Sequence, residues 1–197
     1  MEAIEAILTR RSTRKFSTEL PERGLIEKIL EAGRYAPSGG NSQITHFIVI
    51  ESSAVLKELA ELVRSAFSAM EYTEDTYSSI KNSINASKRG NYIFHYNAPV
   101  LIVTANRKGY GNAMADSACA LENMMIAANA LDLGTCWINQ LHWLDEDPVI
   151  RDYMLKLGLL ENETITGALS VGYPEGGVIE RRPLPRKGNV VTWVGES

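Results

Sequence analysis

The sequence predicts an α+β fold in a single domain spanning residues 1–197. Compact apolar runs at 46–50 and 99–105, each bounded by polar residues, are typical of buried strands. Stretches with apolar residues three or four positions apart separate these runs and predict helices. A polar segment at about 70–98 and a tail at about 175–197 break any regular strand–helix alternation, which favours α+β over a doubly wound α/β fold.

In the first half of the chain, residues 2–11 predict a short helix and residues 21–35 a second one, which the Pro-Ser-Gly-Gly stretch at 37–40 ends. The run HFIVI at 46–50 predicts a buried strand. Ser52 or Ser53 can cap a third helix that reaches about Phe67. The apolar positions at helical spacing in the first two helices are Ile4, Ile7, Leu8, Leu25, Ile26, Ile29 and Leu30.

In the second half, residues 70–92 are rich in serine, asparagine, tyrosine and charge, and predict a mobile lid rather than core. Strands are expected at 99–105, 135–139 and 164–174, and a helix at 145–157 that Gly158 ends. The longest helix, 112–131, is apolar on more than one face, so it is either a central core helix or part of a subunit interface. The tail predicts an extended arm.

Composition excludes several classes of function. The net charge of −4 argues against general nucleic-acid binding, and no apolar run approaches the ~18 residues that suggest a membrane span. The N-terminus is acidic where a secretory signal would be basic. The isolated cysteines Cys119 and Cys136 fit a reducing, cytoplasmic setting better than a disulfide scaffold.

Motifs for protein-based catalysis are also missing. The sequence has no nucleophile elbow and no P-loop, and its GYGNAM segment at 109–114 lacks the third glycine of a dinucleotide-binding fingerprint. The histidines His46, His95 and His142 have no partners at ligand spacing, so no metal site is expected. An enzyme without a nucleophile or an acid–base pair commonly takes its chemistry from a cofactor.

Basic residues gather in two places, which either hold a local anion or form solvated surface patches. Within RRSTRKF at 10–16, Arg10, Ser12 and Arg14 can converge on one anion, because guanidinium groups suit phosphate. The alternative is that they are cations at a helix C-terminus, where the helix dipole favours them. The second cluster comprises Arg181, Arg182, Arg186 and Lys187.

Two further segments can contact a ligand. In APSGGNSQ at 36–43, small residues allow close approach and Ser38, Asn41 and Gln43 supply polar groups, although a tight turn explains the same pattern. In LGTCWIN at 133–139, a flat ligand could lie against Trp137 and Ile138, with backbone N–H groups beyond them at its edge.

In this order, the segments resemble the nitroreductase family of FMN-dependent oxidoreductases. The resemblance covers nearly the whole chain and is least secure at 70–98. It rests on R-R-S-x-R-x-F, A-P-S-x-x-N-x-Q, G-T-C-W-I, a G-Y-P turn at 172–174, and P-R-K before V-V-x-W. Where the family usually has Q-P-W, this chain has Gln43-Ile44-Thr45, which alters one edge of the pocket.

The resemblance implies a homodimer with a central mixed sheet flanked by helices and a C-terminal arm exchanged onto the partner. Arg14 would approach the N1/O2 side of FMN, and backbone N–H groups of Asn139 and Gln140 would lie near N5 and O4. The FMN phosphate would be held by Arg10 and Ser12 with Arg186 and Lys187, and Arg11 would assist. The rest of the cofactor site would be Pro37, Ser38, Gly39 and Asn41 from the other subunit, with Gln43, Trp137 and Ile138.

The implied activity is transfer of electrons from NADH or NADPH to a small acceptor, such as a nitroaromatic, a quinone or a flavin, by ping-pong hydride transfer. No side chain is assigned a catalytic role, because FMN would carry the chemistry. Two alternatives stay open: the same FMN fold with a dedicated substrate, as in a reductive dehalogenase or a dehydrogenase, and a flavin-binding module without turnover. Whether His95 lines the flavin site also stays open.

Overall fold

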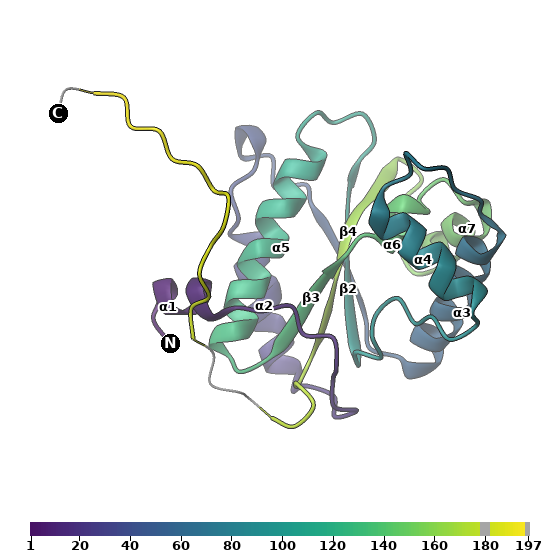
Figure 1. Cartoon of the computed structure of the whole chain (residues 1–197), viewed down its shortest axis with the longest axis horizontal. Helices are drawn as coiled ribbons and strands as arrows, with labels where there is room; N and C mark the ends of the chain where they lie inside the picture. The colour runs from purple at the N-terminus through teal and green to yellow at the C-terminus, as the bar shows by residue number, and fades with distance from the viewer. Residues whose placement is uncertain (178–181, 196–197) are drawn as a thin grey trace.

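The structure, a computed structural model, describes residues 1–177 and 182–195. Its centre is a four-stranded sheet with strand order β1-β2-β4-β3 (Figure 1). The strands are β1 (His46–Ile50), β2 (Val100–Arg107), β3 (Gly134–Ile138) and β4 (Glu163–Gly172). The predicted strand at 46–50 is confirmed, and the other three lie within two residues of their expected starts.

Neighbouring strands in this sheet are all antiparallel, so the expectation of a mixed sheet is wrong. Two helices connect β1 to β2 and return the chain to the end of the sheet it left, where Ile50 pairs with Leu101. A single helix, α5, connects β2 to β3. These two strands run in the same direction, because both are antiparallel to β4. They do not pair with each other, because β4 lies between them and is antiparallel to both.

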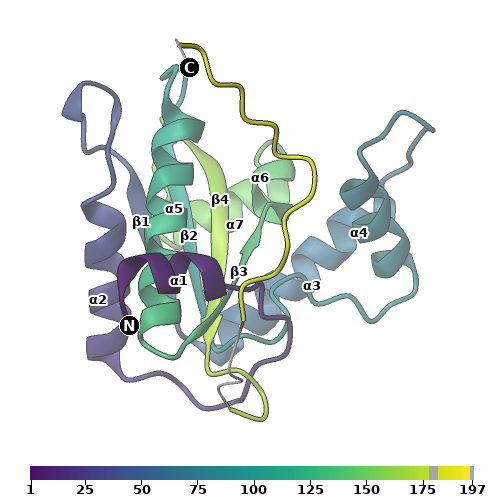
Figure 2. The same ribbon diagram turned by 60° about the vertical axis from the view of Figure 1, so that its left-hand side comes forward.

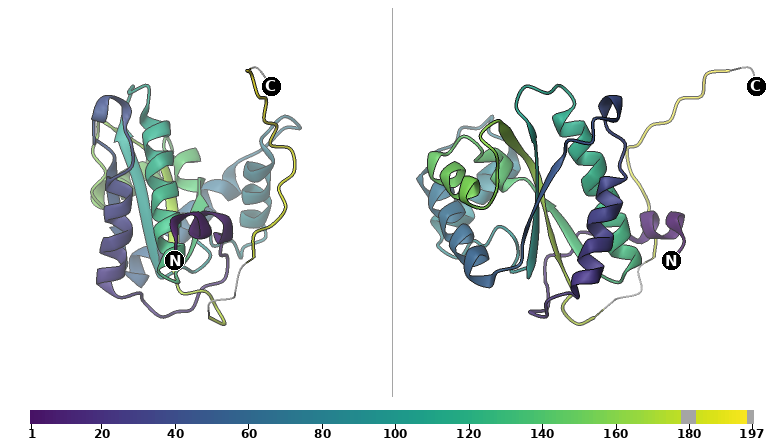
Figure 3. Two further views of the ribbon diagram at one scale, coloured as in Figure 1. Left: turned by 90° about the vertical axis from the view of Figure 1, so that its left-hand side faces the viewer. Right: turned by 180° about the vertical axis from the view of Figure 1, so that it is seen from behind.

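Helices cover both faces of the sheet (Figures 1 and 3). Helices α2 (Arg23–Arg34) and α5 (Ala113–Ala130) lie on one side, and α3 (Ser53–Ala69), α4 (Ser78–Lys88) and α7 (Pro148–Lys156) lie on the other. Along β2, Val100 and Ile102 pack into the core beneath α2 and α5, whereas Leu101 and Val103 pack into the opposite core. A strand buried on both faces is mostly apolar, which explains the unbroken run from Val100 to Val103.

The N-terminal helix, α1 (Ala3–Thr9), lies across α5 (Figure 2). Asn129 of α5 donates from Nδ2 to the carbonyl oxygen of Ala6 and to Oγ1 of Thr9, both at 2.9 Å. The predicted helix is confirmed, but its apolar stripe faces away from this core. The exposed fractions of Ile4, Ile7 and Leu8 are 68%, 43% and 44%. Helix α5 itself packs against both the sheet and α2, so one side of it belongs to the core, and its part in a subunit interface stays a prediction.

The segment at 70–98 contributes its second half to the core, while residues 71–79 are mostly exposed, so the expectation that it lies wholly outside the core is wrong. Helix α4 occupies its middle, and Ile84 and Phe94 are 0% and 1% exposed within the core beneath α3. Two of the three buried residues of α4 are serines, Ser83 and Ser87, so its inner face carries little hydrophobic signal. This composition explains why apolar periodicity did not predict the helix.

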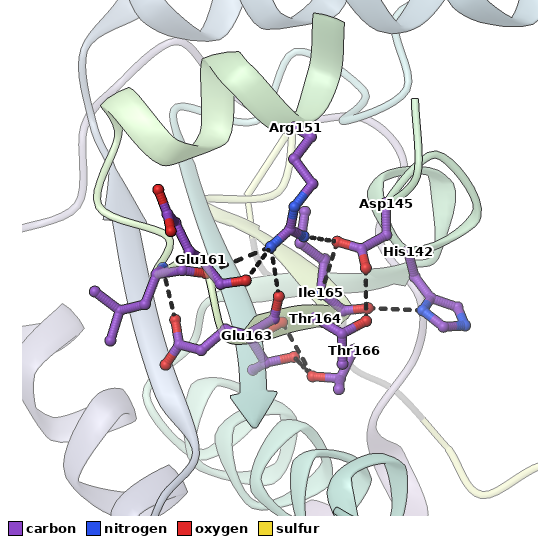
Figure 4. Close-up of polar contacts among 10 residues, drawn as sticks. His142, Asp145, Arg151, Glu161, Glu163, Thr164, Ile165 and Thr166 are labelled. Carbon is purple, nitrogen blue, oxygen red and sulfur yellow. Dashed lines mark hydrogen bonds and ion pairs between the residues drawn. The ribbon is translucent and has the colours of Figure 1, made fainter. Parts of the chain in front are cut away.

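The helix expected at 145–157 begins later, at Pro148, and Asp147 caps it by accepting the N–H groups of Val149 and Ile150, both at 3.0 Å. Asp145 instead lies buried before the helix, 5% exposed (Figure 4). Its carboxylate accepts from Nη1 of Arg151 at 3.0 Å, Oγ1 of Thr164 at 2.6 Å and the N–H of Ile165 at 3.0 Å. A buried carboxylate requires such partners, and here they join α7 to β4.

The described part of the tail, residues 182–195, is an extended and exposed segment that leaves the body of the domain (Figure 2). Trp193 and Val194 are 92% and 97% exposed. These residues confirm an extended arm, whereas its exchange onto a partner stays a prediction. Residues 178–181, which include Arg181 of the second basic cluster, lie outside the described residues, as do 196–197. No helix within the described ranges is long and apolar enough to cross a membrane.

Candidate functional site

A cleft of about 590 Å³ opens beside the end of β3, where the chain enters the short helix α6 (Gln140–Trp143). Arg14 lies at this cleft together with Trp137, Ile138, Asn139 and Gln140, so the structure brings five of the predicted site residues to one place. The other lining residues are Tyr77, Ser79, Asn82, Ser83, Asn85, Ala86, Arg89, Tyr92, Tyr96, Cys136 and Trp143.

The segment that carries Arg14 is pressed against β3. Ser12 forms a parallel bridge with Thr135, and the N–H of Thr13 donates to the carbonyl oxygen of Thr135 at 2.8 Å. At Gly134 a Cβ atom would lie 2.7 Å from Oγ1 of Thr13, which is too close for an unstrained contact. Only glycine therefore allows this approach, and it explains why Gly134 precedes the cleft-lining strand.

Positive charge gathers around Cys136. A hydrogen bond with Tyr96 and the neighbouring Cys136 raise the pKa of Arg14, and its guanidinium lies 5.9 Å from the centre of the Tyr96 ring. Burial raises the pKa of the Cys136 thiol, while Arg14, a hydrogen bond with Ser12 and the charge of Arg10 act in the opposite direction. The thiol is therefore protonated near neutral pH and is a poor nucleophile. Arg10, Ser12 and Arg14 thus all lie close to one residue.

Gln140 forms the polar floor of the cleft. Its Nε2 donates to the hydroxyl of Tyr92 at 2.7 Å and lies 3.4 Å from Oγ of Ser83. Its Oε1 is buried and has no hydrogen-bond partner within the described ranges. Asn139 is fixed next to it, because its Oδ1 accepts from Nε1 of Trp137 at 2.7 Å.

The remaining cations are placed differently. Arg10 forms an ion pair with Glu122 at 3.7 Å. Arg11 donates to carbonyl oxygens, of Leu8 at 3.0 Å, of Arg10 at 2.7 Å and of Arg182 at 2.6 Å, and so connects α1 to the start of the arm. Arg186 and Lys187 are exposed on the arm, and the structure does not bring them to the cleft.

The loop at 36–43 lines a different hollow, of about 540 Å³, which includes Pro37, Ser38, Asn41 and Gln43. Its backbone is held by Asp116 of α5, which is 6% exposed and accepts the N–H of Gly39 at 3.0 Å. The Tyr110 hydroxyl donates to the same carboxylate at 3.1 Å. A Cβ atom at Gly39 would collide with Asn112 and lie 2.6 Å from that hydroxyl. Within one chain, this loop and the cleft are separate.

We expect Asp116→Ala to lower the free energy of unfolding by about 1–3 kcal/mol, because it leaves the half-buried donors of Gly39 and Tyr110 without their acceptor. Urea denaturation measures the loss, and faster hydrogen exchange at the Gly39 amide would place it in the loop. Tyr110→Phe removes only one donor and should cost less. Equal stability of Asp116→Ala and the unsubstituted protein would show that the carboxylate does not hold the loop.

His95 lies away from the cleft. It lines a third hollow, of about 720 Å³, with residues of α3 and of the loop that follows Phe16. Burial lowers the pKa of His95, so its imidazole is neutral at pH 7. The structure therefore places it beside the core of α3 rather than beside Arg14.

A model of the nitroreductase family matches residues 7–173. The chain belongs to the nitroreductase family. It is 30% identical over 178 residues to a candidate NADH dehydrogenase/NAD(P)H nitroreductase of Archaeoglobus fulgidus, covering 88% of this chain and 86% of that protein. The crystal structure of a nitroreductase with bound FMN from Bacteroides fragilis NCTC 9343 is 33% identical, with a TM-score of 0.86 over 99% of this chain and 100% of that chain.

The nitroreductase fold alone does not select an acceptor. Oxidised iodotyrosine deiodinase bound to FMN and 3-iodo-L-tyrosine shares it with a TM-score of 0.72, over 98% of this chain and 100% of that chain, at 16% identity. In this chain, the cleft residues that sequence reasoning missed come mainly from α4 and the segment after it. The available signal was polar: Ser79, Asn82, Ser83, Ala86 and Arg89 recur at helical spacing and so share one face of α4.

Proposed function

We propose that this nitroreductase is an NAD(P)H-dependent FMN oxidoreductase that passes electrons to a small acceptor such as a nitroaromatic, a quinone or a flavin. The observation that supports it most is the convergence of Arg14, Trp137 and Gln140 on one cleft, from two motifs that lie far apart in the sequence. FMN bound there would supply the hydride chemistry, taking up electrons from NADH or NADPH and releasing them to the acceptor by a ping-pong scheme.

The residues at the cleft fit a flat, anionic aromatic cofactor. Trp137 and Ile138 offer an extended apolar strand, and the lining described here contains cations but no carboxylate. The unpartnered Oε1 of Gln140 is a buried acceptor that a ring N–H can satisfy. Arg14 would stabilise negative charge on the reduced ring system, since a cation held next to the ring attracts the charge that appears on reduction.

For the phosphate of FMN, Arg10 and Ser12 are the best placed groups, because both lie close to Cys136, which lines the cleft. Arg11 already donates to three carbonyl groups, so we assign it an assisting role. Arg186 and Lys187 would reach a phosphate only if the arm adopts another position, such as one packed on a second copy of the chain.

We also propose a homodimer in which the 36–43 loop of one copy completes the cleft of the other. Two features support it: the loop and the cleft occupy separate hollows of one chain, and apolar residues are exposed on α1 and the arm. Pro37, Ser38, Gly39, Asn41 and Gln43 would then contact the partner's cofactor. Because Cys119 and Cys136 are both free thiols, we propose a reducing, cytoplasmic setting.

Flavin binding tests the proposal. The purified protein should be yellow and release FMN on denaturation, and Arg10→Ala should weaken FMN binding about 10- to 100-fold, since it removes a charge-assisted phosphate contact. Titration of the apoprotein with FMN measures the dissociation constant. Arg23→Ala, which breaks exposed ion pairs with Glu27 and Glu51 away from both the cleft and the 36–43 loop, is the control and should leave that constant unchanged. A colourless protein that does not bind added FMN would contradict the proposal.

Steady-state kinetics separate the alternatives. Oxidation of NADH or NADPH with a quinone, giving parallel lines in a two-substrate analysis, supports ping-pong turnover. Intersecting lines would favour an enzyme with a dedicated substrate, such as a reductive dehalogenase or a dehydrogenase. Bound FMN without oxidation of either nicotinamide would favour a flavin-binding module.

A further inference from the structure

One wall of the cleft is the polar face of α4, which the cofactor assignment above does not use. Ser79, Asn82, Ser83, Ala86 and Arg89 lie three or four residues apart, so they form one stripe that faces the cleft. Every residue of the stripe is polar or small. This composition suits contact with a polar ligand rather than packing against another apolar element.

Arg89, at the C-terminal end of α4, is a cation without a partner. Within residues 1–177 and 182–195 its guanidinium has no ion pair and no hydrogen bond, and the described lining of the cleft contains no carboxylate that could neutralise it. Its neighbour Lys88 is instead paired with Glu71, Nζ to Oε1 at 2.8 Å, and does not line the cleft. Arg14, the other cation of the lining, is already in contact with Tyr96.

Aromatic side chains accompany this charge at the cleft. Tyr77 and Trp143 meet edge to face, with ring centres 5.9 Å apart and an angle of 79° between the rings, and both line the cleft. Aromatic walls favour a flat ring, and a guanidinium favours a carboxylate or another anion. The cleft therefore combines recognition of a ring with recognition of a negative charge.

We propose that the acceptor is a flat aromatic molecule bearing an anionic substituent, which Arg89 binds. This inference rests on the proposed function and specifies its substrate class. For a nitroaromatic acceptor, reduction of the nitro group to nitroso takes up two electrons and two protons and releases water. NAD(P)H supplies both electrons and one proton as hydride, and solvent supplies the other proton.

Matched acceptors and matched variants test the inference. The probes are 4-nitrobenzoate and 4-nitrobenzamide, which have similar shapes and differ in charge. Arg89→Ala should lower the ratio of their kcat/KM values, benzoate over benzamide, about tenfold, which is the effect of losing one charge-assisted contact. Lys88→Ala removes the same charge from the same helix end and should leave the ratio unchanged.

A binding measurement gives a readout that does not depend on turnover. Calorimetric titration of the oxidised holoenzyme with benzoate, which cannot be reduced there, should show about tenfold weaker binding in Arg89→Ala and no change in Lys88→Ala. Equal effects in the two variants would overturn the inference in favour of a general charge effect. Slower reduction by NADH in Arg89→Ala, with an unchanged ratio of the two kcat/KM values, would also overturn the inference. Arg89 would then bind the phosphates of the donor. A protein that neither binds FMN nor oxidises NADH or NADPH would overturn the proposed function itself.

Discussion

Replacing Asp145 with alanine is expected to lower the free energy of unfolding by about 3–5 kcal/mol, because it leaves the charge of Arg151 buried without its partner. The side chains of Arg151 and Asp145 are 14% and 6% exposed, and the same carboxylate also accepts from Thr164 and Ile165 (Figure 4). Urea or guanidinium denaturation, followed by circular dichroism, measures the change.

Asp147→Ala provides the matched control two residues away. It removes only the cap of α7 and should cost about 1 kcal/mol. Equal losses in the two variants would show that Asp145 acts merely as a charge near the helix end and that the buried network contributes little.

Replacing Arg14 with alanine is expected to slow reduction by NADH about 100-fold at full FMN occupancy, the cost typical of removing one preorganised electrostatic contact. The flavin midpoint potential should fall as well, because the cation stabilises the reduced state more than the oxidised one. Stopped-flow absorbance measures the rate, and equilibrium titration against a reference dye measures the potential.

Arg14→Lys keeps the charge and should recover part of both losses. Because Arg14 is exposed, neither variant should change the free energy of unfolding by more than about 1 kcal/mol. Weaker FMN binding with an unchanged potential would mean that Arg14 and Arg10 have been assigned each other's roles.

Much of the fold could be predicted because its strands are continuous apolar runs. HFIVI and the run at 100–105 were predicted from local sequence, because each is a short apolar run bounded by polar residues. Strand direction could not be predicted, because it depends on where β4 inserts. Helix α4 was not predicted, because Ser83 and Ser87 occupy its inner face. Helix α6 was not predicted either, because a single turn gives no periodicity.

The candidate site could be predicted where short motifs meet in space. Arg14 and the 137–140 segment do come together, because Thr13 pairs with Thr135. The contribution of α4 was out of reach, since a polar helical stripe has the same pattern whether it faces solvent or a cleft. Asp145 illustrates a related limit: an acidic residue near a helix start usually serves the helix dipole, and only packing shows that this one is buried.

The position of β4 between β2 and β3 has a consequence for synthesis of the protein. Among the described strands, β3 pairs with β4 alone, so that edge of β3 has no partner on the ribosome until residues 163–172 have emerged. Until then, the inner edge of β2 and the edge of β3 that later pairs with β4 expose unpaired backbone groups, the kind of surface that recruits other nascent chains. The cleft is therefore assembled late in translation, and the interval before it closes is when the chain is most prone to aggregate.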